Sequence, residues 1–457
     1  MFMRDTNSLQ NWNKLLDLFN AAIDAVNPCV AVRNVLSLDQ TTLSVQDSRP
    51  YVLDRYDRIC VVGCGKAGAP MAFAVEDVLH ERISGGIVTV KSGHTRAPGD
   101  LQRIRLDEAA HPTPDERGEE SCRAVLRMLE HASGRDLVIA VISGGGSALW
   151  PLPAAGLTLQ DEQATTNALL GCGASIQEMN IVRKHISAIK GGLAARAAHP
   201  ATVIALLISD VPGNDPATIA SGPFAADVST FNDARAVIDK YKLASRVPPG
   251  VQKRLQQGCA GLIEETPGPQ EACFSRGMQC LCATNEIAVR AAARRAGQLG
   301  YEPVILTTSI AGDVRDATEW LFARIHAYSQ RCDRRRYCLL SAGETTVNLP
   351  QIHGRGGRNQ HMALAMAKLL CNRSNITFLS CGTDGTDGPT DVAGALVDGH
   401  SWKRMLDGSI SPDAALENHC SYDAVRAAGL HVITGPTATN VMDVQIALID
   451  PGSDLRG

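Results

Sequence analysis

One glycine-rich stretch of the chain has the composition of an anion-binding turn. Three glycines stand between two serines in Ser143–Ser147, directly after the apolar run Leu137–Ile142. A nucleophile elbow has the pattern G-x-S-x-G, and the glycine that should follow Ser147 by two positions is replaced by Leu149. Successive backbone N–H groups converge well on phosphate or carboxylate oxygens. The stretch therefore predicts an anion cradle, with a plain tight turn as the alternative.

A second glycine turn contains Gly63, Gly65 and Gly68 at the spacing of the dinucleotide-binding fingerprint, with Lys66 inside it. That fingerprint also requires an acidic residue at the end of the next strand to bind a ribose hydroxyl. The next apolar run ends instead in Lys91-Ser92-Gly93-His94, which disfavours NAD but leaves NADP open. The alternative is that Lys66 and the turn bind another anion at the start of a helix.

Acidic residues follow two further apolar runs. Asp210 comes after Thr202–Ile208, and Asp384 comes after Ile376–Leu379. Carboxylates at the ends of strands are suitable ligands for Mg²⁺, which prefers oxygen. The neighbouring Asp215, Asp387 and Asp391 also fit turns and helix caps, where aspartate binds nearby backbone N–H groups.

Cationic residues stand in two more stretches. Arg355 and Arg358 lie among glycines just before a predicted helix, and a guanidinium binds anionic oxygens in pairs. Arg183 and Lys190 are seven residues apart and would share one face of a helix, either toward a ligand or toward solvent. His111 and His185 fit either a site or hydrogen-bonded structural positions.

The elements that must position these residues alternate along the chain. Predicted strands of about five residues alternate with longer helical patterns, which is typical of a parallel or mostly parallel sheet covered on both faces. The predicted strands are 58–62, 86–90, 103–106, 137–142, 202–208, 280–283, 303–307, 337–341, 376–379, 395–397, 431–433 and 446–449. The predicted helices are 9–26, 69–80, 114–131, 160–170, 181–198, 286–299, 314–328 and 359–370.

The alternation weakens across residues 227–266, where Pro and Gly cluster. We therefore expect two α/β domains, at residues 1–235 and 270–450, both Rossmann-like α/β/α folds. We expect part of the tail after Pro389 to complete the first domain. Because ligands bind at the carboxyl ends of strands in open α/β sheets, the loops named above are expected to meet in one site.

Composition excludes several classes of function. The net charge is −4 and aromatic residues are 4% of the chain, which argues against a nucleic-acid partner or an anionic membrane surface. The 14 cysteines are scattered without zinc spacing, and the first residues contain no apolar stretch of signal-peptide length. We expect reduced thiols and a cytoplasmic protein. Neither a Walker A pattern nor a protein-kinase motif set is present.

Several stretches together resemble one family. VVGCGKAGAPMA, HPTPDERG, ISGGGSALW, NIVRKHISAIKGG, ISDVPGNDPATIASGP, GETTV, GRGGRNQ and GTDGTDGPTDVAGA occur in the order found in the class II glycerate 2-kinases, also called the MOFRL family. The resemblance implies two α/β domains with the site in a cleft between them. It also implies transfer of the γ-phosphoryl group of ATP to the 2-hydroxyl of D-glycerate, with Mg²⁺. The family's functional lysine, aspartate and arginine fall on Lys66, Asp210 and Arg358.

The chain departs from the family pattern at His361 and Asp313, where Glu is common, and after Lys190, where an extra Arg commonly follows the glycines. The predicted catalytic residues are Lys66, Asp210, Arg358 and Asp384, with Asp210 and Asp384 as metal ligands. The predicted residues for substrate binding are Arg183, Lys190, Arg355 and Asn359. The predicted residues for nucleotide binding are Gly63, Gly65, Ser143, Gly144, Gly145, Gly146, Ser147, Glu344 and Thr345.

The expected partners are ATP and D-glycerate, and a homodimer is left open. Two other functions are left open as well. One is a hydroxypyruvate reductase, a label that this family often carries, and the GCGKAG fingerprint supports it. The other is a protein that binds a small metabolite without turnover, and the three acid-bearing loops argue against it. Which acid is the base is also left open.

Overall fold

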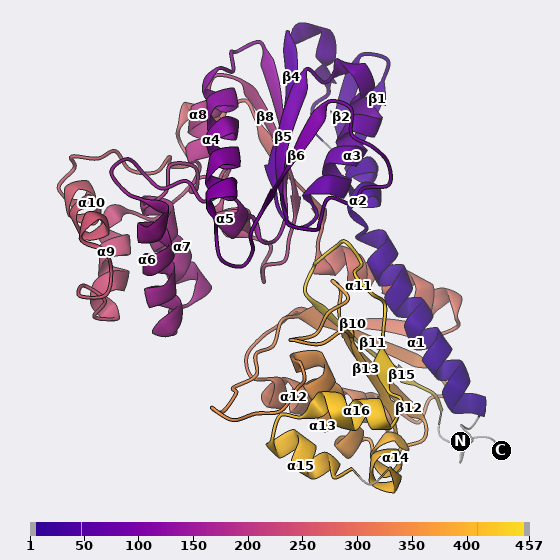
Figure 1. The fold of residues 1–457 in the computed structure, drawn as a ribbon. Helices are drawn as coiled ribbons and strands as arrows, with labels where there is room; N and C mark the ends of the chain where they lie inside the picture. The colour runs from indigo at the N-terminus through magenta and orange to yellow at the C-terminus, as the bar shows by residue number, and fades with distance from the viewer. Residues whose placement is uncertain (1–5, 47, 409, 452–457) are drawn as a thin grey trace. The chain divides into compact units, whose positions relative to one another are not determined.

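The structure is a computed structural model that describes residues 6–46, 48–408 and 410–451. The chain forms two compact units, drawn in Figure 1. The N-terminal unit is Pro28–Cys282, and the C-terminal unit combines Met1–Asn27 with Ala283–Gly457. The α/β class predicted from the sequence is therefore present in two units, but the chain divides at other positions than 235 and 270.

The N-terminal unit is built on a six-stranded sheet in the order β6-β5-β4-β7-β8-β9. Counted from β4, this is the order 3-2-1-4-5-6 of the doubly wound dinucleotide-binding fold. The pairs from β6 to β8 are all parallel. The order reverses between β4 and β7, which is where such sheets bind ligands. The strands are β4 (Arg58–Cys64), β5 (Gly85–Lys91), β6 (Ile104–Ala109), β7 (Asp136–Ile142), β8 (Thr202–Ile208) and β9 (Met278–Ala283).

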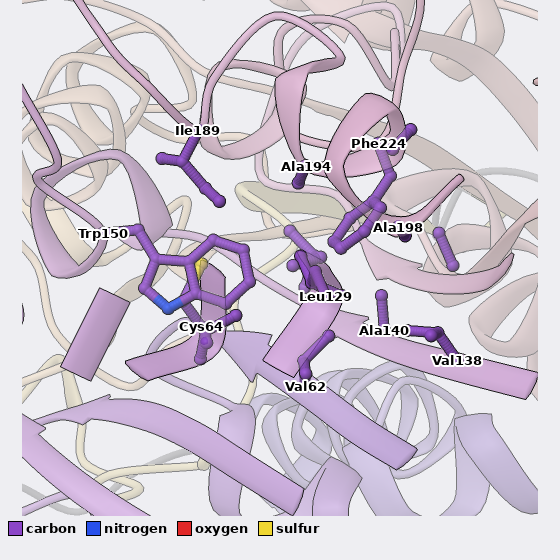
Figure 2. Close-up of a cluster of buried hydrophobic side chains, with 14 of the residues drawn as sticks. Val62, Cys64, Leu129, Val138, Ala140, Trp150, Ile189, Ala194, Ala198 and Phe224 are labelled. Atoms are coloured by element: carbon purple, nitrogen blue, oxygen red, sulfur yellow. The ribbon is translucent and has the colours of Figure 1, made fainter. Parts of the chain in front are cut away.

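Helices cover both faces of this sheet (Figure 1). On one face, α4 (Glu116–Glu130), α5 (Gly146–Leu149) and α8 (Leu193–Ala198) enclose the apolar cluster of Figure 2. On the other face lie α2 (Pro28–Val35) and α3 (Gly68–Leu79). A small antiparallel sheet of β1 (Leu36–Asp39), β2 (Thr42–Val45) and β3 (Tyr51–Val52) accompanies them.

Trp150 ties the glycine-rich turn to the core. Its ring lies among Cys64, Ile189 and Phe224 in Figure 2, with ring centroids 6.3 Å apart for Trp150 and Phe224. Its Nε1–H donates to Thr89 Oγ1 at 3.0 Å, so the buried indole is satisfied. The backbone that follows Ser143–Ser147 is therefore held rigidly.

A separate group of helices extends the N-terminal unit: α6 (Leu159–Gly171), α7 (Ile176–His185), α9 (Phe231–Lys240) and α10 (Pro249–Cys259). They share their own apolar core, which includes Val182 and Phe231. The region expected to be a domain boundary thus belongs to this helical group. The single helix predicted over 181–198 is wrong, because Gly191 and Gly192 have φ of 59° and 80° and separate α7 from α8.

The C-terminal unit contains a mixed sheet in the order β10-β11-β15-β12-β13-β14. Only β10 and β11 pair in parallel, and β15 runs antiparallel to both β11 and β12. This sheet is therefore not the parallel Rossmann-like sheet that was expected. The strands are β10 (Glu302–Ile310), β11 (Tyr337–Gly343), β12 (Ile376–Gly382), β13 (Gly394–Asp398), β14 (His431–Val432) and β15 (Asp443–Ile449).

The expectation that the tail completes the first domain is wrong, because β15 is hydrogen-bonded between β11 and β12. Helix α1 (Thr6–Ala25) joins this unit as well: Trp12 Nε1 donates to Asp398 Oδ2 at 3.2 Å, and Lys14 Nζ donates to the Tyr301 hydroxyl. The other helices are α11 (Asn285–Gln298), α12 (Val314–Ser329), α13 (Arg358–Leu369), α14 (Ser401–Asp407), α15 (Pro412–Glu417) and α16 (Ser421–Ala427).

All 14 cysteines are free thiols in the structure. Among the described residues no single helix is long and apolar enough to cross a membrane. The bent pair Gln10–Ala25 and Pro28–Val35 together has the length and composition of a membrane span.

Candidate active site

The loops that follow β4 and β7 are fastened together at the switch point of the N-terminal sheet. The Lys66 N–H donates to the Gly144 carbonyl at 2.9 Å, and the Ser143 N–H donates to the Cys64 carbonyl at 3.0 Å. The Ser143 Oγ accepts the Ala67 N–H at 3.1 Å and is buried. Ser143 thus joins the two loops and does not face a ligand, contrary to its predicted role in nucleotide binding.

The glycines of these loops permit close approach of backbone and side chains. A Cβ on Gly63 would overlap the Val141 carbonyl, and one on Gly65 would overlap Ser143. Gly63 lies within β4, so it serves strand packing. A Cβ on Gly144 would lie 2.6 Å from Asp210 Cγ. The structure therefore brings Asp210, from the loop after β8, against the Gly144 turn, beside Lys66.

A chain of hydrogen bonds leads from the turn to α7. Ser147 Oγ lies 2.8 Å from Ser221 Oγ, which donates to Asn180 Oδ1 at 2.9 Å. Arg183 is three residues after Asn180 and so on the same side of α7. Burial lowers the pKa of Arg183, and Glu162 opposes that shift. Within the described ranges the Arg183 side chain has neither a hydrogen bond nor an ion pair, so its guanidinium is available to an anion.

Lys190 does not reach this site. It is 1% exposed, and its Nζ donates to Glu162 Oε1 at 2.7 Å and to the Trp150 carbonyl at 2.9 Å. The prediction that Lys190 binds substrate is therefore wrong. The helix is interrupted between α7 and α8, and the backbone there directs the Lys190 side chain into the core. Its neighbour His185 is structural as well, with ring nitrogens bonded to the Ile181 carbonyl and to Glu265.

A second group of charged residues lies at one edge of the C-terminal sheet. Asp443 begins β15 and pairs in register with Gly343 on one side and Gly382 on the other. Arg358 begins α13 and donates two hydrogen bonds to Asp443, from Nε to Oδ2 at 2.6 Å and from Nη2 to Oδ1 at 3.0 Å. Its third nitrogen lies 2.8 Å from Glu344 Oε1.

Asp443 is a residue that the sequence reasoning missed. Burial raises the pKa of Asp443, and the bidentate contact with Arg358 opposes that rise. The same contact raises the pKa of Arg358 against the effect of burial. A Cβ on Gly382 would lie 3.3 Å from Asp384 Oδ1 and 3.5 Å from Asp443 Oδ1, so these two carboxylates lie close together. The strand predicted from the sequence begins only at residue 446, so local sequence contains no signal for Asp443.

Several predicted residues of this unit have structural partners. Asn359 is 1% exposed and is bonded to Asp387 and Ser380, so it does not bind substrate as predicted. Asp387 accepts the backbone N–H groups of Asn359 and Gln360 at 3.0 and 2.8 Å and so caps α13. Thr345 is buried, against its predicted contact with nucleotide.

Arg355 is exposed and lies over the ring of Tyr422, with 4.0 Å from its guanidinium carbon to the ring centroid. Asp391 accepts the Tyr422 hydroxyl, while Asp215 closes an Asx turn on Ala217 and Thr218. Asp391 and Asp215 are therefore turn residues. Within the described part of the chain, no three His, Cys, Asp or Glu side chains gather as a metal site.

Comparison with known proteins decides the family. Residues 14–256 match a family described as a domain of unknown function (DUF4147), and residues 337–443 match the MOFRL family. The glycerate 2-kinase of Pyrococcus horikoshii is 36% identical over 95% of this chain and 96% of its own length. The chain belongs to the glycerate 2-kinase family.

The chain is also similar to a solved structure of a glycerate kinase and to a relative that carries a different name. The crystal structure of a glycerate kinase from Thermotoga maritima superposes with a TM-score of 0.84 at 35% identity, covering 97% of this chain and all of that one. A protein of Agrobacterium vitis, provisionally named hydroxypyruvate reductase, is 42% identical over 86% of this chain and 99% of its own. The family resemblance drawn from the sequence is confirmed.

Proposed function

We propose that the protein is an ATP-dependent glycerate 2-kinase that converts D-glycerate and ATP into 2-phosphoglycerate and ADP. The kinases of Pyrococcus and Thermotoga named above support the reaction. The observation that carries the proposal for this chain is the gathering of Lys66, the Gly144–Gly146 turn and Asp210 at the switch point of the N-terminal sheet. Phosphoryl transfer requires mainly positioning and neutralised oxygen charge, which such a set supplies.

In the proposed reaction the 2-hydroxyl oxygen of D-glycerate forms a bond to the γ-phosphorus while the bond to the ADP oxygen breaks. The hydroxyl proton passes to a carboxylate. Lys66 and Arg358 are assigned to anionic oxygens, and one of them touches the transferring group. Asp210 is the first choice for accepting the proton or holding metal, and Asp384 is the second.

The carboxylates fit Mg²⁺, because this ion is usually held by one or two carboxylates together with substrate phosphates. A Cβ at Gly144 would lie 2.6 Å from Asp210 Cγ, so the turn leaves its carboxylate at the strand end where phosphates are expected. When bound, Mg²⁺ would neutralise charge on the phosphate oxygens. Asp210 is the first choice for holding it, and Asp384 is the second choice.

Arg183 is the residue proposed to bind the carboxylate of D-glycerate. Its desolvated guanidinium lies on the same side of α7 as Asn180, which connects through Ser221 to Ser147. Guanidinium is the side chain best suited to a carboxylate, because it donates two parallel hydrogen bonds. Arg355 is the second cation proposed for substrate, on the weaker ground that it is exposed near Arg358 in the chain.

The reductase alternative has less support from the structure. Strand β5 lies directly beside β4 and ends at Lys91, where a nicotinamide dinucleotide fold would carry an acid for the ribose. Cytoplasmic location is proposed from the free state of all 14 cysteines. Homodimer formation stays a prediction, which light scattering of the purified protein tests.

A coupled assay tests the proposal. Purified protein with D-glycerate, ATP and Mg²⁺ should form ADP, and Lys66→Ala should lower kcat by about two to three orders of magnitude, as loss of one transition-state donor does. Lys253→Ala, at an exposed lysine of α10, is the matched control and should stay active. NADPH oxidation with hydroxypyruvate and without ADP formation would show a reductase. Ligand binding without turnover would show a metabolite-binding protein.

A further inference from the structure

Four basic side chains meet beside the glycine turn of the N-terminal unit, and three of them have no role so far. Lys66 follows β4, Lys91 ends β5 and His94 follows it, and His111 follows β6. A Cβ on Gly145 would lie 3.0 Å from His111 Nε2 and 3.3 Å from Lys66 Cγ, so both side chains lie against this residue. The backbone and the charge of Lys66 both affect the pKa of His94, so the two residues lie close together.

The electrostatics of His111 show that these groups face one another. Burial first, and then the charges of Lys66, Lys91 and His94, together lower the pKa of His111 to about 4. Burial also lowers the pKa of His94, with Lys91 and Lys66 adding to the shift. The space in front of the His111 ring is therefore one of positive potential.

The acids of β6 and of the start of α4 are engaged by other groups, while Asp210 lies against the neighbouring Gly144. Asp115 caps α4 and pairs with Arg117 at 2.7 Å, Asp107 pairs with Arg105 at 2.8 Å, and Glu108 accepts the Gly93 N–H. Lys66 and Lys91 have neither an ion pair nor a side-chain hydrogen bond in the described ranges of the chain. An anion bound here would relieve the mutual repulsion of the cations.

The extent of the cluster indicates which anion. Strands β4, β5 and β6 are neighbours, and adjacent strands lie about 4.8 Å apart, so the strand ends that carry these groups span roughly 10 Å, and from them Lys66 and His111 both reach Gly145. Two lysines and two histidines are more groups than the two oxygens and single charge of one carboxylate can engage, whereas a chain of phosphates has oxygens and charges for all of them. Arg183 and Asp210 are the residues proposed to act on D-glycerate. They lie on the other side of the switch point, beside the loops that follow β7 and β8.

We propose that Lys66, Lys91, His94 and His111 form the subsite for the polyphosphate chain of the nucleotide. Lys91, His94 and His111 are then nucleotide-binding residues in addition to Lys66. The inference rests on the proposed function, because it assigns the donor to one side of the switch point and the acceptor to the other.

Binding of inorganic tripolyphosphate, measured by calorimetry without turnover, tests the subsite. Lys91→Gln should weaken tripolyphosphate binding by about tenfold or more, the range for a lost hydrogen bond to a charged group. D-glycerate binding should change by less than twofold. Lys253→Gln should change neither affinity, and Lys91→Arg should retain most of the tripolyphosphate affinity. His94→Gln is a second variant that does not alter the lysine.

Three results would overturn the subsite. They are no binding of tripolyphosphate by the unaltered protein, unchanged binding in both Lys91→Gln and His94→Gln, and weakening of D-glycerate binding in place of tripolyphosphate binding. Failure of the kinase proposal is distinguishable from these, because it shows as absent ADP formation while the Lys91→Gln effect on tripolyphosphate persists. The thermal midpoint of each variant establishes that it is folded.

Discussion

Replacing Gly144 by Ala should disable the site through Asp210 alone. The φ of Gly144 is negative, so its backbone accepts alanine without strain. The new Cβ would lie 2.6 Å from Asp210 Cγ, whereas ordinary carbon contacts begin at about 3.5 Å. The carboxylate must therefore move by roughly 1 Å.

The expected consequence is loss of turnover with little loss of stability. A displacement of about 1 Å in a reacting group can cost about a hundredfold in rate, which corresponds to about 2.7 kcal/mol in activation free energy. ADP formation at saturating ATP and D-glycerate measures kcat, and a thermal melt measures stability. Gly85→Ala is the control, because a Cβ there meets nothing within 4 Å.

A double mutant makes the reasoning refutable. If Gly144→Ala acts by displacing Asp210, it should cost almost nothing further in an Asp210→Ala background, since coupled residues are not additive. Equal losses in both backgrounds would refute displacement of Asp210, and so would full activity of Gly144→Ala.

The remaining predictions concern a buried ion pair, a buried histidine and the partner of Arg358. Lys190→Met leaves Glu162 as a buried unpaired charge and should lower the free energy of unfolding by about 3–5 kcal/mol, while kcat of the folded enzyme stays unchanged. A folded Lys190→Met variant with a lowered kcat would show that Lys190 does act in the site. The pKa of His361, lowered to about 4 by burial, then by His419 and Arg315, makes the folded state bind fewer protons than the unfolded state. The free energy of unfolding should thus fall as the pH is lowered from 6.5 to 4. His361→Gln lacks this titration, so its free energy of unfolding relative to that of the unaltered protein should rise by about 3 kcal/mol between pH 7 and pH 4, as measured by urea titration. Asp443→Asn should lower kcat about tenfold to hundredfold by releasing Arg358, and an unchanged kcat would show that Asp443 does not position it.

Local sequence predicted a helix or strand correctly where the residues of that element alone determine its bounds. The bounds of β8 agree with the predicted 202–208, because TVIALLI is one uninterrupted buried run between turns. The helical spacing across 181–198 was misleading, because apolar periodicity continues on both sides of the break at Gly191 and Gly192. The argument that placed Arg183 and Lys190 on one helix face failed with that helix.

Features that depend on distant segments were not predictable from local patterns. Asp443 meets Arg358 only because β15 inserts between β11 and β12, and nothing near Asp443 in the chain specifies that pairing. Helix α1 was predicted from its amphipathic pattern, but the pattern does not say which unit it covers. The glycine turns could be predicted as places where other atoms closely approach the backbone, because such places require a residue without a Cβ and the glycines are visible in the sequence.

The position of β15 has a consequence for the order in which the protein can fold during synthesis. The N-terminal unit is continuous from Pro28 to Cys282, so it can fold as soon as it has left the ribosome. The C-terminal unit cannot, because its sheet lacks an inner strand until Asp443–Ile449 has been translated. Helix α1 precedes the N-terminal unit in the chain, so its apolar face stays uncovered while Pro28–Cys282 is produced. The segments on the two sides of the N-terminal unit therefore become ordered together, and the unit that they form is the one that we expect to need chaperones.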